Sequence, residues 1–143
     1  MRVDIVNGPN LNLLGIRQEN IYGKTCFLQI RKLLLSKFCK LDVNIIIYQS
    51  NSESKLIRFI QKSNADYFII NMAGYSYSSV SILDSLLYKN KPYIEVHISN
   101  IFNRESFRSK SIFTKYSEGI IAGFGYYVYY LSIYYILIKH YSI

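Results

Sequence analysis

Short apolar runs alternate along the chain with segments in which apolar residues recur every three or four positions. The runs predict strands at residues 2–6, 43–49, 66–72, 93–99 and 119–123. The periodic segments predict helices at 25–38, after 50–53, at 79–88 and in the apolar stretch that follows 119–123. Because strands alternate with helices and crossovers are right-handed, we expect an α/β fold with a doubly wound, five-stranded parallel sheet.

Two details of the helices can be predicted from residue spacing. The helix at 25–38 has apolar residues at helical spacing, which are expected to face the core: Phe27, Ile30, Leu33, Leu34 and Phe38. The letters "SNSE" at 50–53 predict a capping box with Ser50 as the N-cap and Glu53 three residues later. The chain shows no internal repeat or linker, so residues 1–143 are interpreted as a single domain.

Polar side chains follow several of the predicted strands. In doubly wound sheets, ligands bind beyond the carboxyl ends of the strands. We therefore expect a group of polar residues to converge at one edge of the sheet: Asn7, Asn10, Asn71, His97 and Ser99.

The predicted strand at 93–99 carries an acid and an imidazole at alternate positions, Glu95 and His97. Residues two apart in a strand lie on one face, so Glu95 is expected to orient His97 and set its tautomer. An imidazole held in this way exchanges a proton near neutral pH. A histidine in a strand is also often a satisfied structural residue, so this pair alone does not establish catalysis.

Arginines occur beside candidate site residues in two predicted loops. Arg17 and Tyr22 share the long loop after the first strand. Tyrosine ordinarily has a pKa near 10, and a neighbouring guanidinium favours the phenolate, so the pair is a candidate for an activated base. A tyrosine ring that packs under its own loop is an equal alternative. Further along, Glu105 lies between Arg104 and Arg108 and predicts a local ion pair with one of them.

Composition limits the other classes of function. The formal charge of +8 suits an acidic partner, but the basic residues are dispersed, which disfavours nucleic-acid binding. Cys26 and Cys39 have no metal-ligand spacing and are interpreted as reduced thiols of a cytoplasmic protein, and the apolar N-terminus is too short for a signal peptide. The uncharged segment 119–138 approaches the length of a membrane span, but its glycines and tyrosines favour a strand, a turn and a helix.

Four segments, taken together, resemble the type II 3-dehydroquinate dehydratases of the shikimate pathway. They are "GPNLNLLGIRQENIYG" at 8–23, "YQSNSE" at 48–53, "IEVHISNIFNRESFR" at 94–108 and "GIIAGFGYY" at 119–127. The resemblance implies a flavodoxin-like fold and a homododecamer built from four trimers. It also implies dehydration of 3-dehydroquinate to 3-dehydroshikimate through an enolate, without a metal or an organic cofactor.

The resemblance implies a catalytic role for five residues. Tyr22 matches the base that removes the proton next to the ketone, and Arg17 matches the loop arginine that activates it. Asn10 matches the residue that holds a water against the enolate oxygen. His97 matches the general acid that protonates the departing hydroxyl, and Glu95 matches the carboxylate that orients this histidine.

Substrate-binding residues are implied in the same way. Asn71 matches a residue that hydrogen-bonds substrate hydroxyls, while Ile98 and Ser99 match donors to the substrate carboxylate. Arg108 matches a further substrate-binding arginine. Asp84 matches an acid that reaches the site of a neighbouring subunit.

One segment departs from the pattern of the family. The family usually has "NPGAYTHTS" where this chain has "NMAGYSYSS" at 71–79, so Met72 replaces a proline and Tyr77 replaces a histidine that contacts substrate. We still expect Tyr77 at the site. The departure leaves open a diverged, inactive relative, and a flavodoxin-like module that binds a small anion is a further alternative. The single glycine and the proline of "NGPNLN" disfavour a phosphate-binding loop.

Overall fold

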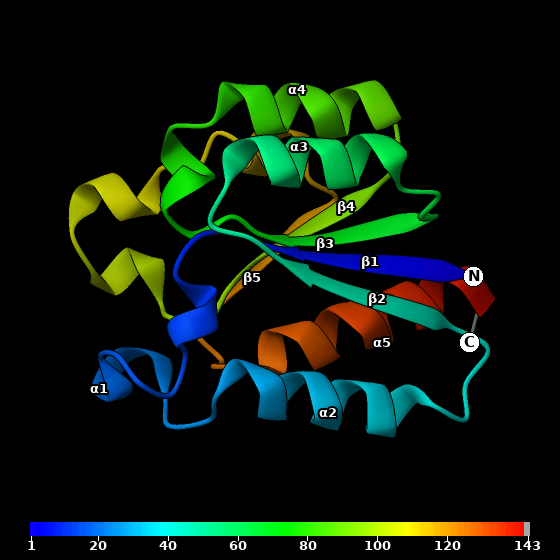
Figure 1. Ribbon diagram of the computed structural model, residues 1–143, viewed down its shortest axis with the longest axis horizontal. Coiled ribbons are helices and arrows are strands. Elements are labelled where there is room, and N and C mark those ends of the chain that lie inside the picture. The colour runs from blue at the N-terminus through cyan, green and yellow to red at the C-terminus, as the bar shows by residue number, and fades with distance from the viewer. Residues whose placement is uncertain (142–143) are drawn as a thin grey trace.

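The computed structural model describes residues 1–141 and contains a parallel sheet between two pairs of helices (Figure 1). The strands are β1 (Arg2–Asn7), β2 (Asn44–Gln49), β3 (Tyr67–Asn71), β4 (Tyr93–His97) and β5 (Gly119–Ala122), in the spatial order β2-β1-β3-β4-β5. The helices are α1 (Glu19–Tyr22), α2 (Phe27–Phe38), α3 (Glu53–Lys62), α4 (Val80–Lys89) and α5 (Tyr127–Tyr141). The predicted five-stranded, doubly wound sheet is confirmed.

The loops at one end of the sheet contain short 3-10 helices. They are η1 (Leu11–Leu13), η2 (Ala73–Tyr77), η3 (Ile101–Asn103), η4 (Ser106–Ser109) and η5 (Thr114–Tyr116). In Figure 1 the loops that contain η1 and α1 lie at the end of the sheet opposite the two chain termini. All strands are parallel, so the carboxyl ends of β1, β3 and β4 all lie at this end of the sheet.

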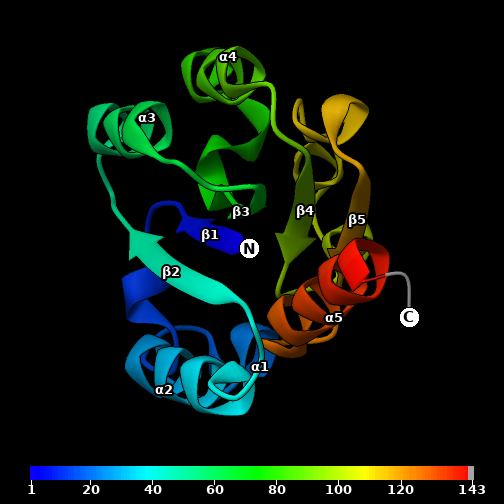
Figure 2. The same cartoon turned by 90° about the vertical axis from the view of Figure 1, so that its right-hand side faces the viewer.

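Each face of the sheet packs against one helix pair. Figure 2 shows α3 and α4 on one side of the strands and α2 and α5 on the other. Alternate strand residues divide between two cores: Ile5, Ile69 and Val96 belong to the core with α2 and α5, whereas Val6 and Ile70 belong to the core with α3 and α4. This alternation fixes which face each polar residue at a strand end occupies.

Two predicted details of the helices are wrong. Leu33 does not face the core: it is 45% exposed, while Leu34 next to it is 1% exposed. The apolar face of α2 is therefore narrower than the spacing suggested. The N-cap of α3 is Ser52 and not Ser50, because the Ser52 hydroxyl accepts a hydrogen bond from the Lys55 backbone N–H at 3.4 Å. Ser50 instead accepts one from the Ser52 N–H at 3.0 Å.

Gly8 allows two of the loops at the carboxyl edge to cross in contact. Its N–H donates to the Asn71 carbonyl at 2.8 Å. A Cβ atom at this position would lie 2.4 Å from the backbone oxygen of Met72. Because backbone cannot move aside as a flexible side chain can, only glycine fits between β1 and the loop after β3.

The apolar C-terminal segment forms the predicted strand, turn and helix. β5 is followed by Gly123 and Gly125, both in the left-handed region with φ of 91° and 59°, and then by α5. Within residues 1–141, no helix has both the length and the apolar character needed to cross a bilayer.

Neighbouring leucines on α2 provide a test of this packing. Leu34→Ala should lower the free energy of unfolding by about 2–5 kcal/mol, because the side chain is buried in the core. Leu33→Ala makes the same chemical change on the same helix at an exposed position and should cost less than about 1 kcal/mol. Urea denaturation of both variants measures the difference, and equal losses would contradict the assignment of the buried face.

Candidate functional site

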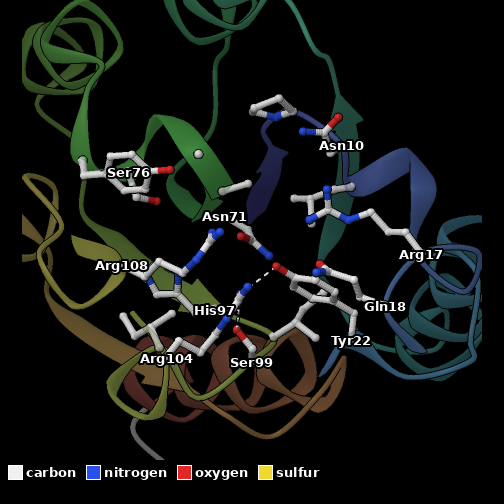
Figure 3. A pocket seen from close by; sticks show the side chains of 17 residues that line it. Asn10, Arg17, Gln18, Tyr22, Asn71, Ser76, His97, Ser99, Arg104 and Arg108 are labelled. Carbon is white, nitrogen blue, oxygen red and sulfur yellow. Dashed lines mark hydrogen bonds between the residues drawn. The ribbon is translucent and has the colours of Figure 1, made fainter. Parts of the chain in front are cut away.

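A cavity of about 490 Å³ opens at the carboxyl ends of β3 and β4, a volume typical of sites for small molecules. Figure 3 shows polar side chains from several loops directed into it. The residues that line it are Pro9, Asn10, Leu11, Arg17, Gln18, Tyr22, Asn71, Ala73, Gly74, Ser76, Tyr77, His97, Ile98, Ser99, Ile101, Arg104 and Arg108.

The predicted convergence of polar residues at the strand ends is largely what the structure shows. Asn71 ends β3, His97 ends β4, and Ile98 and Ser99 follow directly; all four are buried and line the cavity. Asn10, in the loop after β1, lines the opposite wall. Asn7 is the exception, because it is fully buried beneath the cavity and does not line it.

Glu95 and His97 lie on one face of β4, as their spacing predicted. The Nε2 atom of His97 lies 2.7 Å from Oε1 of Glu95, and both side chains are buried. The second carboxylate oxygen of Glu95 accepts a hydrogen bond from Thr114 Oγ1 at 2.5 Å. Burial by itself would raise the pKa of Glu95, but hydrogen bonds from His97, Ser111 and Thr114 outweigh it and lower this pKa. Glu95 is therefore an anion that fixes the imidazole from behind the cavity.

Tyr22 is held between two arginines. The guanidinium carbon of Arg17 lies 4.9 Å from the centre of the Tyr22 ring, so Arg17 contacts the face of the ring. The hydroxyl of Tyr22 instead accepts a hydrogen bond of 2.7 Å from Nη1 of Arg104 (Figure 3). The same nitrogen lies 3.3 Å from Oγ of Ser99. The cation at the phenol oxygen is therefore Arg104, which the sequence reasoning did not select.

Arg104 and Arg108 differ in their distance from the carboxylate of Glu105. Arg108 forms the closer pair, with Nε 2.8 Å from Glu105 Oε2, whereas Nε of Arg104 is 3.7 Å from it. Arg108 nevertheless lines the cavity, as expected. Together with Arg17, this places three guanidinium groups around the cavity, and none of the described residues that line it is Asp or Glu. The site is suited to an anion.

The loop after β3 supplies the remaining wall. Tyr77 lines the cavity as expected, and its ring packs edge-on against Phe107 of η4 with the ring centres 5.6 Å apart. Ser76 and Gln18 also line it and were not foreseen; neither has a sequence signal that distinguishes it from other polar loop residues. Asp84 does not reach this cavity, since it lies exposed on α4.

Taken together, the groups at this site are able to bind an anion and to move protons at two positions. A phenol with a guanidinium at its oxygen and an imidazole backed by a carboxylate face one cavity from different walls (Figure 3). Groups of these two types can act as a base and an acid in one reaction. Among residues 1–141, no three His, Cys, Asp or Glu side chains form a cluster suited to a metal ion.

Comparison with known proteins finds relatives that cover most of this chain. Residues 1–137 match the family model described as dehydroquinase class II. The 3-dehydroquinate dehydratase of Francisella tularensis subsp. novicida (strain U112) is 47% identical over 125 residues, which cover 87% of this chain and 86% of the relative.

Two solved structures have the same fold. The type II dehydroquinase from Butyrivibrio crossotus superimposes with a TM-score of 0.92 at 35% identity, covering 96% of this chain and 97% of the other. The type II dehydroquinase from Propionibacterium acnes gives a TM-score of 0.89 at 34% identity, with 94% of each chain covered.

The lowered pKa of Glu95 predicts how stability depends on pH. The folded protein binds this proton more weakly than the unfolded chain does, so the stabilisation is complete above the usual pKa of a glutamate and is lost as the pH falls through the lowered value. Glu95→Gln should therefore reduce the loss of stability between about pH 6 and about pH 3. Urea denaturation across this range measures it, and parallel curves for the two proteins would contradict the prediction.

Proposed function

Because the chain belongs to the class II dehydroquinase family, whose members dehydrate 3-dehydroquinate in the shikimate pathway, we propose that Tyr22 and His97 are the base and the acid of this elimination. The observation that carries the proposal is the hydrogen bond of 2.7 Å from Arg104 to the Tyr22 hydroxyl, in the cavity that His97 also lines.

The three arginines suit the carboxylate of the substrate. Arg108 lines the same cavity as Ile98 and Ser99, so it would bind the carboxylate together with the Ser99 hydroxyl and the backbone N–H groups of these two residues. Charge-assisted hydrogen bonds from a guanidinium and from such donors hold a small anion firmly. Asn71 ends β3, Tyr77 lies in the loop that follows, and both line the cavity, so they would contact the hydroxyl groups on the substrate ring.

In the first step the phenolate of Tyr22 takes the proton on the carbon next to the ketone, and the electrons of that C–H bond form an enolate. The guanidinium of Arg104 at the phenol oxygen and that of Arg17 over the ring both stabilise negative charge on Tyr22 before the transfer. Asn10 would hold a water against the enolate oxygen. Each role requires the loop that contains η1 and α1 to lie over the cavity, as it does here.

In the second step the enolate collapses and the C–O bond to the departing hydroxyl breaks. His97 gives this oxygen a proton, so that water leaves and 3-dehydroshikimate remains. Because Nε2 of His97 faces Glu95, the other ring nitrogen, Nδ1, is available to the cavity. For this transfer both ring nitrogens must carry hydrogen, with Nε2–H donating to the carboxylate of Glu95 and Nδ1–H directed to the leaving oxygen.

Removal of either group should slow turnover strongly, but each removal blocks a different step of the reaction. Tyr22→Phe and His97→Ala should each lower kcat by about 10²–10⁴-fold, because each lacks one general acid or base. Turnover is followed from the ultraviolet absorbance of the conjugated enone product. In D₂O, His97→Ala should still exchange the proton next to the ketone, whereas Tyr22→Phe should not, since only the latter lacks the base.

Tyr88→Phe is the matched control for this experiment, since it removes the same hydroxyl from a residue that is 77% exposed on α4. It should retain wild-type activity. Near-normal turnover by folded Tyr22→Phe would exclude the assigned base, and absence of turnover by the folded wild-type protein would exclude the function.

We also propose that the protein is a homododecamer of four trimers, in which Asp84 of one subunit completes the site of the next. Its exposure on α4, away from the cavity of its own subunit, is consistent with this role. Subunit mixing tests it. Asp84→Ala and Tyr22→Phe should both be impaired alone, but a co-refolded mixture should regain activity, because some sites combine Tyr22 from one subunit with Asp84 from another.

Light scattering on the same samples measures the assembly. A monomer in solution, or a mixture no more active than its components, would contradict the shared site.

A further inference from the structure

A buried chain of hydrogen bonds leads from the centre of the sheet to the cavity. Tyr129, on α5, is 1% exposed, and its hydroxyl donates to Oδ1 of Asn7 at 2.6 Å. The hydroxyl oxygen of Tyr129 in turn accepts a hydrogen bond of 3.0 Å from Nδ2 of Asn71. Asn7 and Asn71 are register partners at the ends of β1 and β3, and both project from the face that α5 covers. Of these three residues, only Asn71 lines the cavity.

The backbone carbonyl of Tyr48 fixes the direction of every hydrogen bond in this buried series. Nδ2 of Asn7 donates to the carbonyl oxygen of Tyr48 at 3.3 Å, and a carbonyl can only accept. Oδ1 of Asn7 therefore faces Tyr129 and takes the single proton of its hydroxyl. The oxygen of Tyr129 has no second proton, so it must accept from Asn71, whose NH₂ group is held toward α5.

The side-chain oxygen of Asn71, Oδ1, is then the part of the amide left for the cavity. Among residues 1–141, no donor is hydrogen-bonded to this oxygen. It is also not a fully buried atom, since no fully buried side-chain oxygen or nitrogen among these residues lacks a partner, so it is accessible from the cavity. Figure 3 shows the Asn71 side chain at the centre of the cavity, between Tyr22 and His97. Burial also raises the pKa of Tyr129, which keeps its hydroxyl protonated at neutral pH and preserves the direction of the chain.

We propose that Tyr129 and Asn7 are positioning residues that fix the Asn71 amide with its oxygen toward the substrate, so that this oxygen accepts a hydrogen bond from a ring hydroxyl. The inference rests on the proposed function, which supplies the hydroxyl. Without the hydroxyl of Tyr129 the amide of Asn71 is free to turn, and a turned amide presents a donor where the substrate requires an acceptor. Substrate binding weakens, while the base and the acid stay in place.

A double-mutant cycle tests this role. Tyr129→Phe should raise KM for 3-dehydroquinate about tenfold, with kcat changed less than about threefold, as expected for a lost hydrogen bond in the bound state. On an Asn71→Ala background the same substitution should change KM by less than about twofold, since the amide it acts through is gone. Tyr135→Phe removes a hydroxyl from the same helix, where it donates to Glu118 at 2.6 Å, and should leave both constants unchanged.

Asn7→Ala provides a second route if Tyr129→Phe does not fold. It releases the Tyr129 proton from Asn7 and lets it turn toward Asn71, so the same rise in KM and the same dependence on Asn71 are expected. A KM within twofold of wild type in either folded variant overturns the inference. So does an equal effect with and without Asn71, which is the pattern of a purely structural network.

The two proposals fail in distinguishable ways. If the wild-type protein turns over 3-dehydroquinate and the cycle is additive, only the positioning role falls. If the wild-type protein binds the compound by calorimetry without turning it over, the catalytic assignment falls and the cycle is repeated on Kd. If it neither binds nor converts the compound, both fall.

Discussion

The parallel alignment of the strands is the constraint on which the rest of the structure depends. Both faces of such a sheet are covered by helices, so polar side chains on its strands reach a ligand only at the ends. Here β1, β3 and β4 finish side by side, with Asn7 paired to Asn71 in the ladder. His97 ends the strand beside them. Chemistry on this fold is therefore confined to one edge, and the loops that leave that edge determine what it does.

The alternation of side chains divides the edge into two functional layers. Asn7 and Asn71 face α5, and their amides meet Tyr129 there. Glu95 and His97 face the opposite side, where Glu95 is hydrogen-bonded both to His97 and to Thr114. Each polar group that enters the sheet is thus bonded to a partner on its own face, which avoids the cost of burying an unpaired polar group. In both layers a residue that lines the cavity is hydrogen-bonded to a buried residue behind it.

Much of the fold and part of the candidate site could be predicted from the sequence, and the reasons differ by residue. The strands and the pairing of Glu95 with His97 depend on local periodicity, which sequence records directly. Ser50 was predicted in place of Ser52 because serine is a favoured N-cap residue type and the two lie two positions apart, so only backbone geometry selects between them. Leu33 was wrongly predicted to face the core, because the width of the buried face of a helix depends on the elements that pack against it.

The residues that were missed depend on contacts over long sequence distances. Arg104 meets Tyr22 across 82 positions, and Tyr129 meets Asn7 across 122. The local sequence does not distinguish Arg104 from Arg108, since both flank Glu105. The shorter ion pair with Glu105 is formed by Arg108, the arginine to which the resemblance assigned substrate binding. Tyr129 is one of 15 tyrosines, several of them on the same helix, so only the packing of α5 identifies it.

The loops around the cavity contain residues in unfavourable backbone conformations, which neighbouring contacts must hold. Three of the four non-glycine residues with positive φ among residues 1–141 line it: Asn10, Gln18 and Ala73. Asparagine tolerates the left-handed region well, but Ala73, with φ of 49°, carries a Cβ atom there at a cost of roughly 1–2 kcal/mol. The family usually has glycine at that position.

The change to Ala73 therefore strains the loop that carries Tyr77, and this strain persists only if neighbouring contacts hold the loop. Those contacts are present: Tyr75 donates to the Asn51 carbonyl at 3.1 Å, and Tyr77 packs against Phe107. A histidine at position 77 has a smaller ring, which reaches less far toward Phe107 than tyrosine does. The contact of Tyr77 with Phe107 is therefore one of those that hold the loop in which Ala73 has a positive φ.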